Sequence, residues 1–243
     1  MSGIRITVAK NFNNPLLPRS DVGSLLMQDN AIAIYEMRSF IDRGPNGHHL
    51  ILNNLSIDSE GLASDGVIGH NAFTGVTEPA AFTMLVAINV PSAPTSICQV
   101  YNTFAEPNGL PTGHTGSRMS IDTSGVLSIG LGVNNGGNGQ VNLNCGSGIA
   151  GWTIFAASFS STGLFCLRSN GTKYSAKLNG VRGAAIRPIT LAGGYAALHN
   201  IGIPGHIGLV SVYAGALSES EMMILIQKGQ AIMRDRGVNS ILA

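Results

Sequence analysis

Residues 205–221 read GHIGLVSVYAGALSESE and contain the sharpest change of pattern in the chain. The first part, Ile207–Tyr213, is rich in Ile, Val and Tyr, which favours a β-strand. The second part contains Ser218 and Glu221 at the spacing of a capping box, in which each residue satisfies a backbone group of the other. The stretch therefore predicts a strand that leads directly into a helix.

The predicted helix covers residues 218–236. Arg234 and Arg236 lie in its last turn, where positive charge interacts favourably with the helix dipole, and Gly237 can end it in a left-handed conformation. Its apolar residues recur at helical spacing and share one face, namely Met222, Leu225, Ile226, Gly229, Ile232 and Met233. Because such a face needs an apolar partner, we expect the helix to pack on the edge of a sandwich.

Upstream of this stretch, apolar residues recur mainly at every second position. Phe82–Val90 and Leu127–Val133 alternate in this way, which predicts strands with one or both faces buried. Asn170-Gly171 and Asn179-Gly180 suit tight hairpin turns. Further strands are predicted at Ala31–Arg38, His49–Leu52, Ile97–Phe104, Arg118–Ile121, Trp152–Phe159, Leu164–Arg168 and Lys173–Leu178. This spacing of short strands predicts an all-β, antiparallel two-sheet sandwich.

Charge is scarce in this chain. Only 11% of the 243 residues are charged, against about 25% on average, and the formal net charge is +1. A near-neutral chain lacks the basic surface that binding to nucleic acid requires. No apolar run approaches the ~20 residues of a membrane span, and Met1–Lys10 lacks the pattern of a signal peptide. We therefore expect neither nucleic-acid binding nor membrane insertion nor secretion.

The first 28 residues differ in character from the rest. Ile4, Ile6 and Val8 alternate, and then Asn13-Asn14-Pro15 and Pro18 interrupt the pattern. Two interpretations stay open: an ordinary strand of the same domain, or an arm that pairs with a neighbouring subunit by strand addition. The expected organisation is an N-terminal strand or arm at 1–28 and one domain at 29–243.

Four segments in order resemble laminin-G-like, concanavalin A-like domains, of the kind found in bacteriophage virion proteins. Residues 31–49 are similar to an opening strand followed by a "D-x-S-G-N-G-H-H" turn, here Asp42 to His49. Residues 151–158 look like "W-x-x-V-A-x-T", and residues 178–180 stand where the family has "V-D-G". Residues 205–221 resemble the closing "G-x-I-x-x-V-x-I-Y-x-x-A-L-S-x-x-E-I".

The resemblance implies a jelly roll of two curved antiparallel sheets whose first and last strands pair. Many members of this family bind carbohydrate, and others are structural. Two departures affect the family's calcium or ligand site: Asn179 replaces an acidic residue, and the run of Gly and Asn at 134–139 indicates a longer loop. Calcium could use Asp42, Asp122 and backbone carbonyls, but carboxylates are too sparse here, and we expect no metal or cofactor.

The sequence argues against catalysis. Glycoside hydrolysis needs two positioned carboxylates, yet Asp and Glu are absent from Thr123 through Ser218. Neither a nucleophile elbow nor a phosphate-binding loop is present. The six histidines lack zinc-ligand spacing, and His48 and His49 match the family turn, which favours a structural role. Three cysteines at wide spacing (Cys98, Cys145 and Cys166) favour buried free thiols.

Carbohydrate binding requires rings that stack on sugars and polar groups that recognise hydroxyls. We predict that the single tryptophan, Trp152, is a core residue, and Tyr195 is the strongest candidate for an exposed ring. The predicted carbohydrate-binding residues, which we place in loops, are Tyr101, His114, Asn134, Asn135, Asn138, Tyr195 and His199, with Phe104 as a further ring.

The expected function is that of a non-enzymatic bacteriophage virion protein, at the tail or capsid surface, which binds a host glycan or receptor. The missing secretion signal and the scarcity of charge support this, because interface cores are depleted in charged residues. Expected partners are virion proteins, further copies of this chain and a host surface polysaccharide. Two alternatives stay open: a purely structural decoration or tail-assembly subunit, and a bacterial carbohydrate-binding module.

Overall fold

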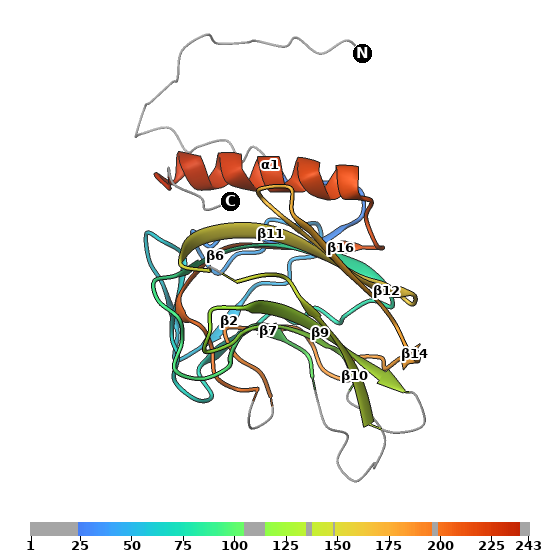
Figure 1. Ribbon diagram of the computed structural model, residues 1–243. Helices are drawn as coiled ribbons and strands as arrows, with labels where there is room; N and C mark the ends of the chain where they lie inside the picture. Colours follow the sequence, from blue (N-terminus) through green and yellow to red (C-terminus); the bar gives the residue numbers. More distant parts are fainter. Residues whose placement is uncertain (1–23, 105–114, 135–137, 148, 196–198, 239–243) are drawn as a thin grey trace, which may run out of the picture.

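The computed structural model describes residues 24–104, 115–134, 138–147, 149–195 and 199–238. Two antiparallel sheets lie face to face, and a single helix among these residues lies across one of them (Figure 1). The prediction of an all-β, concanavalin A-like jelly-roll sandwich with a C-terminal helix is confirmed. No helix in the described ranges is long and apolar enough to cross a membrane.

Sheet A has the strand order β13-β12-β11-β6-β16-β4-β3, and β1 also pairs with β16. The pairing of β1 with β16, in which Ala31 lies opposite Tyr213, confirms that the first and last strands of the predicted jelly roll are neighbours. The strands of sheet A are β1 (Ala31–Tyr35), β3 (Ser56–Ile57), β4 (Leu62–Asp65), β6 (Phe82–Val90), β11 (Gly151–Phe159), β12 (Gly163–Arg168), β13 (Lys173–Lys177) and β16 (Pro204–Ala214).

Sheet B has the order β10-β9-β8-β7-β15-β5-β2, and β14 also pairs with β9. Every strand predicted between residues 31 and 213 has a counterpart in one of the two sheets, while β3, β4, β5, β10, β14 and β15 were not predicted. The strands of sheet B are β2 (Ile51–Asn53), β5 (Asn71–Phe73), β7 (Cys98–Asn102), β8 (Ser117–Ile121), β9 (Leu127–Asn134), β10 (Asn138–Asn144), β14 (Val181–Arg182) and β15 (Thr190–Leu191).

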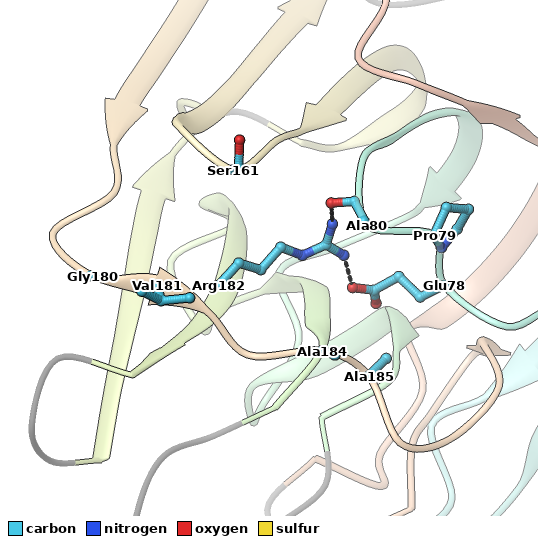
Figure 2. Close-up of a pocket in the computed structure, with 9 residues that line it drawn as sticks. All are labelled: Glu78, Pro79, Ala80, Ser161, Gly180, Val181, Arg182, Ala184 and Ala185. Carbon is cyan, nitrogen blue, oxygen red and sulfur yellow. Dashed lines mark hydrogen bonds and ion pairs between the residues drawn. The ribbon is translucent and has the colours of Figure 1, made fainter.

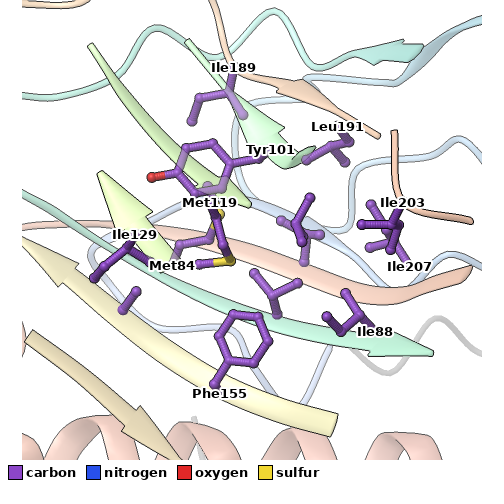
Figure 3. Packing of buried hydrophobic residues seen from close by; sticks show 14 of the residues in the cluster. Met84, Ile88, Tyr101, Met119, Ile129, Phe155, Ile189, Leu191, Ile203 and Ile207 are labelled. Carbon is purple, nitrogen blue, oxygen red and sulfur yellow. The ribbon is translucent and has the colours of Figure 1, made fainter. Parts of the chain in front are cut away.

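The main core lies between the sheets and is built from the inward-facing residues of both (Figure 3). Met84, Ile88 and Phe155 of sheet A meet Met119 and Ile129 of sheet B there, and all five are fully buried. Phe82 and Phe159 stack at one end, with ring centroids 4.5 Å apart. Because successive side chains of a strand point to opposite faces of the sheet, alternate residues of these strands lie in this layer.

The helix α1 (Glu219–Asp235) packs on the outer face of sheet A, so its predicted place at the sandwich edge is wrong (Figure 1). The reason is that β6 and β11 are apolar on both faces, and their outer residues, such as Leu85 and Ile154, need a cover. The predicted capping box is confirmed: Ser218 N donates to Glu221 Oε2 at 2.7 Å, and Glu221 N donates to Ser218 Oγ.

Three further predictions need correction or limits. Trp152 is not a core residue: it lies half-buried on the outer face of sheet A, beside Gly208 and Met233. In the run at 134–139, Asn134 at the end of β9 pairs with Asn138 at the start of β10, and residues 135–137 lie outside the described residues. Most of the predicted arm, residues 1–23, lies outside the described residues.

Candidate functional site

The outer face of β8, β9 and β10 carries a patch of polar side chains, which we call the polar face. It alternates along each strand with inward residues such as Met119, Ile129 and Leu143, which are part of the core. Apart from one cation, the side chains of this face are amides and hydroxyls. The polar face consists of Arg118, Ser120, Ser128, Gln140, Asn142 and Asn144.

Strand register places Arg118 and Asn142 on the two sides of a glycine. Arg118 in β8 pairs with Gly130 in β9, and Gly130 pairs with Asn142 in β10. A Cβ at Gly130 would lie 2.7 Å from Asn142 Oδ1 and 3.2 Å from Arg118 Nε. Gly130 therefore lets the guanidinium and the amide approach each other directly over the sheet surface.

Arg118 is held in place by two rings. Its guanidinium carbon lies 5.3 Å from the centroid of the buried Phe104 ring, and Nη1 lies 3.2 Å from His199 Nδ1. Because a guanidinium has only donors, His199 Nδ1 is the acceptor in this hydrogen bond. The rings of Phe104 and His199 pack edge to face, with centroids 5.8 Å apart.

The charge of Arg118 is not balanced nearby. Among the residues that the structure describes, no carboxylate lies within ion-pair distance of this guanidinium. Burial lowers the pKa of Arg118 below its ordinary value, because a partly desolvated cation without a counterion is destabilised. Binding of an anion at the polar face would offset part of the electrostatic energy that the desolvation of Arg118 costs.

A second feature is a pocket of about 470 Å³ between the segments 78–80 and 180–185, with Ser161 at one side (Figure 2). Its wall is mostly apolar and includes Pro79, Ala80 and Val181. The Val181 side chain is 76% exposed beside it. The Arg182 side chain runs across the floor to meet Glu78 and the carbonyl oxygen of Ala80 (Figure 2).

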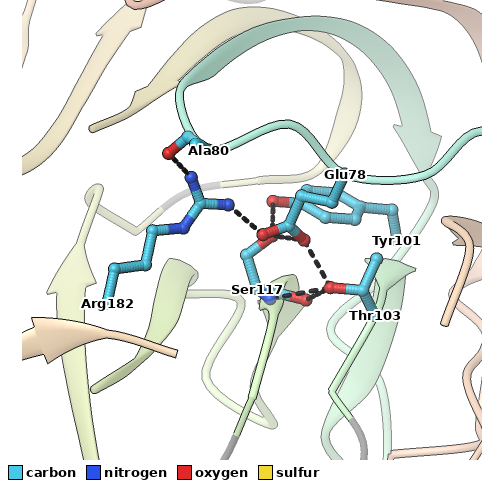
Figure 4. A network of polar contacts seen from close by, with 6 residues as sticks. All are labelled: Glu78, Ala80, Tyr101, Thr103, Ser117 and Arg182. Atoms are coloured by element: carbon cyan, nitrogen blue, oxygen red, sulfur yellow. Dashed lines mark hydrogen bonds and ion pairs between the residues drawn. The ribbon is translucent and has the colours of Figure 1, made fainter. Parts of the chain in front are cut away.

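The carboxylate of Glu78 is fully engaged in a buried network (Figure 4). Its Oε1 pairs with Arg182, and its Oε2 accepts hydrogen bonds from the hydroxyls of Thr103 and Ser117. The side chains of Glu78 and Arg182 are 0% and 8% exposed. This carboxylate has fixed donors at both oxygens, so it joins segment 78–80 to sheet B.

Tyr101 must be removed from the predicted carbohydrate-binding residues. It is fully buried in β7, and its hydroxyl lies 2.9 Å from Ser117 Oγ inside the same network. Burial raises its pKa well above the ordinary value. The prediction is wrong because Tyr101 faces the core: the strand, not a loop, sets the direction of its side chain.

The other predicted residues lie in several places. His199 contacts Arg118 beside the polar face, whereas Tyr195 packs on Phe73 and donates a hydrogen bond to Pro188 O. Arg187 also lies over the Tyr195 ring, at 4.9 Å from its centroid. Asn134 is exposed at the end of β9, where Val181 pairs with it. His114, Asn135 and the side chain of Asn138 lie outside what the structure describes.

The two carboxylates considered for calcium have structural roles. Asp42 is buried and accepts hydrogen bonds from the backbone N–H of Ile34, Gly44 and His48. Asp122 accepts two backbone N–H groups of its own turn. In the described ranges, no group of three or more His, Cys, Asp or Glu residues is arranged to hold a metal ion.

Sequence reasoning does not single out Arg118, Gln140 or Asn142, because it looks for sugar contacts in loops. A signal for them exists. Polar residues alternate with apolar ones along Arg118–Ile121 and Gln140–Asn144, which indicates an outward-facing polar surface on the sheet itself. What the sequence does not show is that Gly130 brings two of these side chains together.

The fold of this chain is a two-sheet antiparallel β-sandwich that carries the polar face on the outer side of sheet B. Its sequence matches no family model and no curated protein. Its structure is similar to a Trypanosoma rangeli sialidase in complex with 2,3-difluorosialic acid, with a TM-score of 0.63 and 14% identity over 90% of this chain. It is also similar to the binding domain of botulinum neurotoxin serotype C1, with a TM-score of 0.54 and 12% identity over 83% of this chain.

These similarities cover only part of the other proteins. The chain spans 36% of the sialidase chain and 52% of the toxin binding domain. The neighbours thus include both an enzyme and a binding domain, at identities that establish the sandwich fold alone.

Proposed function

We propose that this protein is a non-enzymatic, lectin-like sandwich that binds a host glycan through the polar face. The observation that carries the proposal is the half-buried Arg118 without a carboxylate partner, beside Asn142 and Gln140. Guanidinium and amide groups fixed on a rigid sheet suit the paired hydroxyl and carboxylate oxygens of a sugar. The absence of carboxylates from residues 123–218 supports a binding role over hydrolysis.

The charge of Arg118 indicates the class of glycan. A ligand carboxylate would supply the counterion that the described residues do not, so the proposed ligand is an acidic glycan. The similarity to a sialidase solved with a difluorosialic acid is consistent with this choice, because that sugar carries a carboxylate. Phe104 is buried beneath Arg118 and supports it from below.

The test is a glycan array with the purified protein, comparing sialylated and uronate-containing glycans with neutral ones. We expect binding to acidic glycans that Arg118→Ala weakens about 10- to 100-fold, the range for a charge-assisted hydrogen bond. Lys177→Ala, which removes an exposed cation from β13 in sheet A, is the matched control and should bind normally.

Gly130→Ala provides a second probe that spares the fold. The added methyl group would press on Asn142 Oδ1, at the end of an exposed side chain, and on Cγ and Nε of Arg118, so it should displace both groups and lower glycan affinity with little change in melting temperature. Failure of the protein to bind any glycan, or unchanged binding by Arg118→Ala, would exclude the polar face as the binding site.

The setting that we propose is the surface of a bacteriophage virion, in the tail or the capsid. Residues 29–243 would form the binding domain, and residues 1–28 an arm that contacts virion proteins or another copy of the chain. The near-neutral composition supports assembly into a particle. Finding genes for capsid or tail proteins beside its gene would support this setting, and their absence would favour a bacterial carbohydrate-binding module.

One observation favours the alternative of a purely structural subunit. Val181 and Ile186 are large apolar residues with 76% and 58% exposure, and both lie near the apolar pocket. Such a surface suits contact with another protein. Light scattering distinguishes the two roles: an oligomer that Val181→Ser dissociates, together with an empty glycan array, would support the structural role.

A further inference from the structure

Two of the three cysteines face each other across the core between the sheets. Cys166 lies in β12 of sheet A, and its side chain faces inward, while its neighbours Phe165 and Leu167 face the helix. Cys145 directly follows β10 of sheet B, where its backbone N donates to Leu127 O at 2.7 Å. Both thiols are free and fully buried.

Contacts on both sides of the pair hold the two segments together. Tyr174 in β13 lies opposite Cys166 in the sheet, and any side chain at Gly146 would collide with its hydroxyl. Arg168 Nη1 donates a hydrogen bond to Ser147 O at 3.1 Å. The chain directly after Cys145 therefore packs on two neighbours of Cys166.

The two thiols are also close enough to interact electrostatically. A hydrogen bond with Cys145 raises the pKa of Cys166 well above its ordinary value, and burial adds to the effect. Cys98 is separate from this pair: it lies in β7, and its thiol donates to Ser96 O at 3.2 Å.

We propose that Cys145 and Cys166 are a thiol–disulfide pair that links sheet A to sheet B under oxidising conditions. The inference is independent of glycan binding. It rests on two inward-facing thiols of the same core, one from each sheet, and on the flanking chain being held in place on both sides.

The chemistry balances with a low-molecular-weight disulfide, such as oxidised glutathione, as the oxidant. One protein thiolate attacks this disulfide, forms a mixed disulfide and releases one glutathione thiolate. The second protein thiolate then attacks the protein sulfur of the mixed disulfide, and the second glutathione leaves. The protein loses two protons and two electrons, and one oxidised glutathione becomes two reduced molecules.

Burial controls when this reaction occurs. The raised pKa of Cys166 keeps its thiolate scarce in the folded state, so native protein should react slowly with the oxidant. During refolding both thiols are exposed, and the crosslink should form readily. Once formed, it would join β12 to the end of β10, the strand that carries Gln140, Asn142 and Asn144 of the polar face.

The experiment refolds the full chain in a glutathione redox buffer and, in parallel, in a reducing buffer. Peptide mapping should find Cys145 linked to Cys166 and a mass lower by about 2 Da. The crosslink closes a loop of roughly 20 residues and should raise the melting temperature by roughly 5–10 °C. Cys98→Ala should keep both results, whereas Cys145→Ser and Cys166→Ser should lose them.

Mapping of the wild-type chain keeps the test decisive even if a serine variant fails to fold. Three free thiols after oxidative refolding, or a disulfide that includes Cys98, would overturn the proposal. A Cys145–Cys166 crosslink that lowers the melting temperature would overturn it as well, because the sheets would then have to distort to accommodate the bond.

Discussion

At the residue scale, the buried carboxylate of Glu78 holds distant segments of the chain together. Its carboxylate contacts Arg182 from the 180–185 segment, and the hydroxyls of Thr103 and Ser117 from sheet B. Arg182 in turn lies over the Phe82 ring, at 5.5 Å from its centroid. One side chain thereby joins three segments that are distant in the sequence.

Glu78→Gln should lower the free energy of unfolding by about 3–5 kcal/mol, because it leaves the Arg182 guanidinium buried without a counterion. Urea denaturation measures the change. The double variant Glu78→Gln/Arg182→Met removes both charges and should be more stable than Glu78→Gln alone. A single variant within 1 kcal/mol of wild type, taking about 1 kcal/mol as the error of the method, would show that the pair is not desolvated.

The raised pKa of Tyr213 predicts how the stability of the fold changes as the pH becomes alkaline. Its hydroxyl donates to Leu26 O at 2.9 Å, and burial raises its pKa to about 12. Since the folded pKa lies above the unfolded value of about 10, this contribution to stability is complete below pH 10 and is lost as the pH rises through 12.

Tyr213→Phe should therefore cost about 1 kcal/mol at pH 8, from the lost hydrogen bond, and should make the decline between pH 10 and 12 shallower. Urea titrations at several pH values measure both effects. Tyr35 and Tyr101 are buried as well, but they are present in both proteins, so the difference isolates Tyr213. Identical pH profiles for the two proteins would contradict the assignment.

At the scale of elements, β1 shows how an edge strand is protected. On the side away from β16, Ile34 N donates to Asp42 Oδ1, Arg43 N donates to Ile34 O, and Asn46 Nδ2 donates to Ile32 O. The Asp42–His49 turn thus occupies the backbone groups that an exposed edge would offer to another chain. The motif that resembles the family turn has a structural purpose in this protein.

Asp42→Ala should lower the free energy of unfolding by about 3 kcal/mol and increase aggregation, because three backbone N–H groups lose a charged acceptor. Asp122→Ala is the matched control. It removes an acceptor of two N–H groups from an exposed turn and should cost about 1 kcal/mol. Thermal unfolding and light scattering measure the two effects. Equal losses for both variants would count against a special role for the β1 edge.

The elements that the sequence predicts well are those with many alternating residues. β6, β9, β11 and β16 each carry enough alternation to be recognised, and the capping box marks the start of α1. The two-residue strands β3, β14 and β15 have no period to detect, because they exist only where a neighbouring strand offers partners. The candidate site is harder to predict from the sequence, because Arg118 and Asn142 become neighbours only through strand register.

At the scale of the molecule, α1 adds a third layer to the sandwich. Its apolar face shows that it needs a partner, but only the two-sided burial of sheet A shows which surface it covers.

Leu225→Ala should cost about 3 kcal/mol of unfolding free energy, because it opens a cavity beneath the helix. The neighbouring exposed residue provides the control: Ile224→Ala should cost under about 1 kcal/mol. If Leu225→Ala and Ile224→Ala lowered the unfolding free energy by similar amounts in chemical denaturation, the helix would not pack on sheet A through Leu225.

The pairing of β1 with β16 sets the order of events during synthesis. Ala31 lies opposite Tyr213, and β6 also needs β16 as its neighbour, so sheet A has a gap at its centre until the last strand is made. A nascent chain that ends before residue 204 cannot close this gap, and the apolar outer faces of β6 and β11 stay exposed to solvent. Sheet A can therefore complete its folding only after β16 has been synthesised, and such non-local strand pairing favours slow folding.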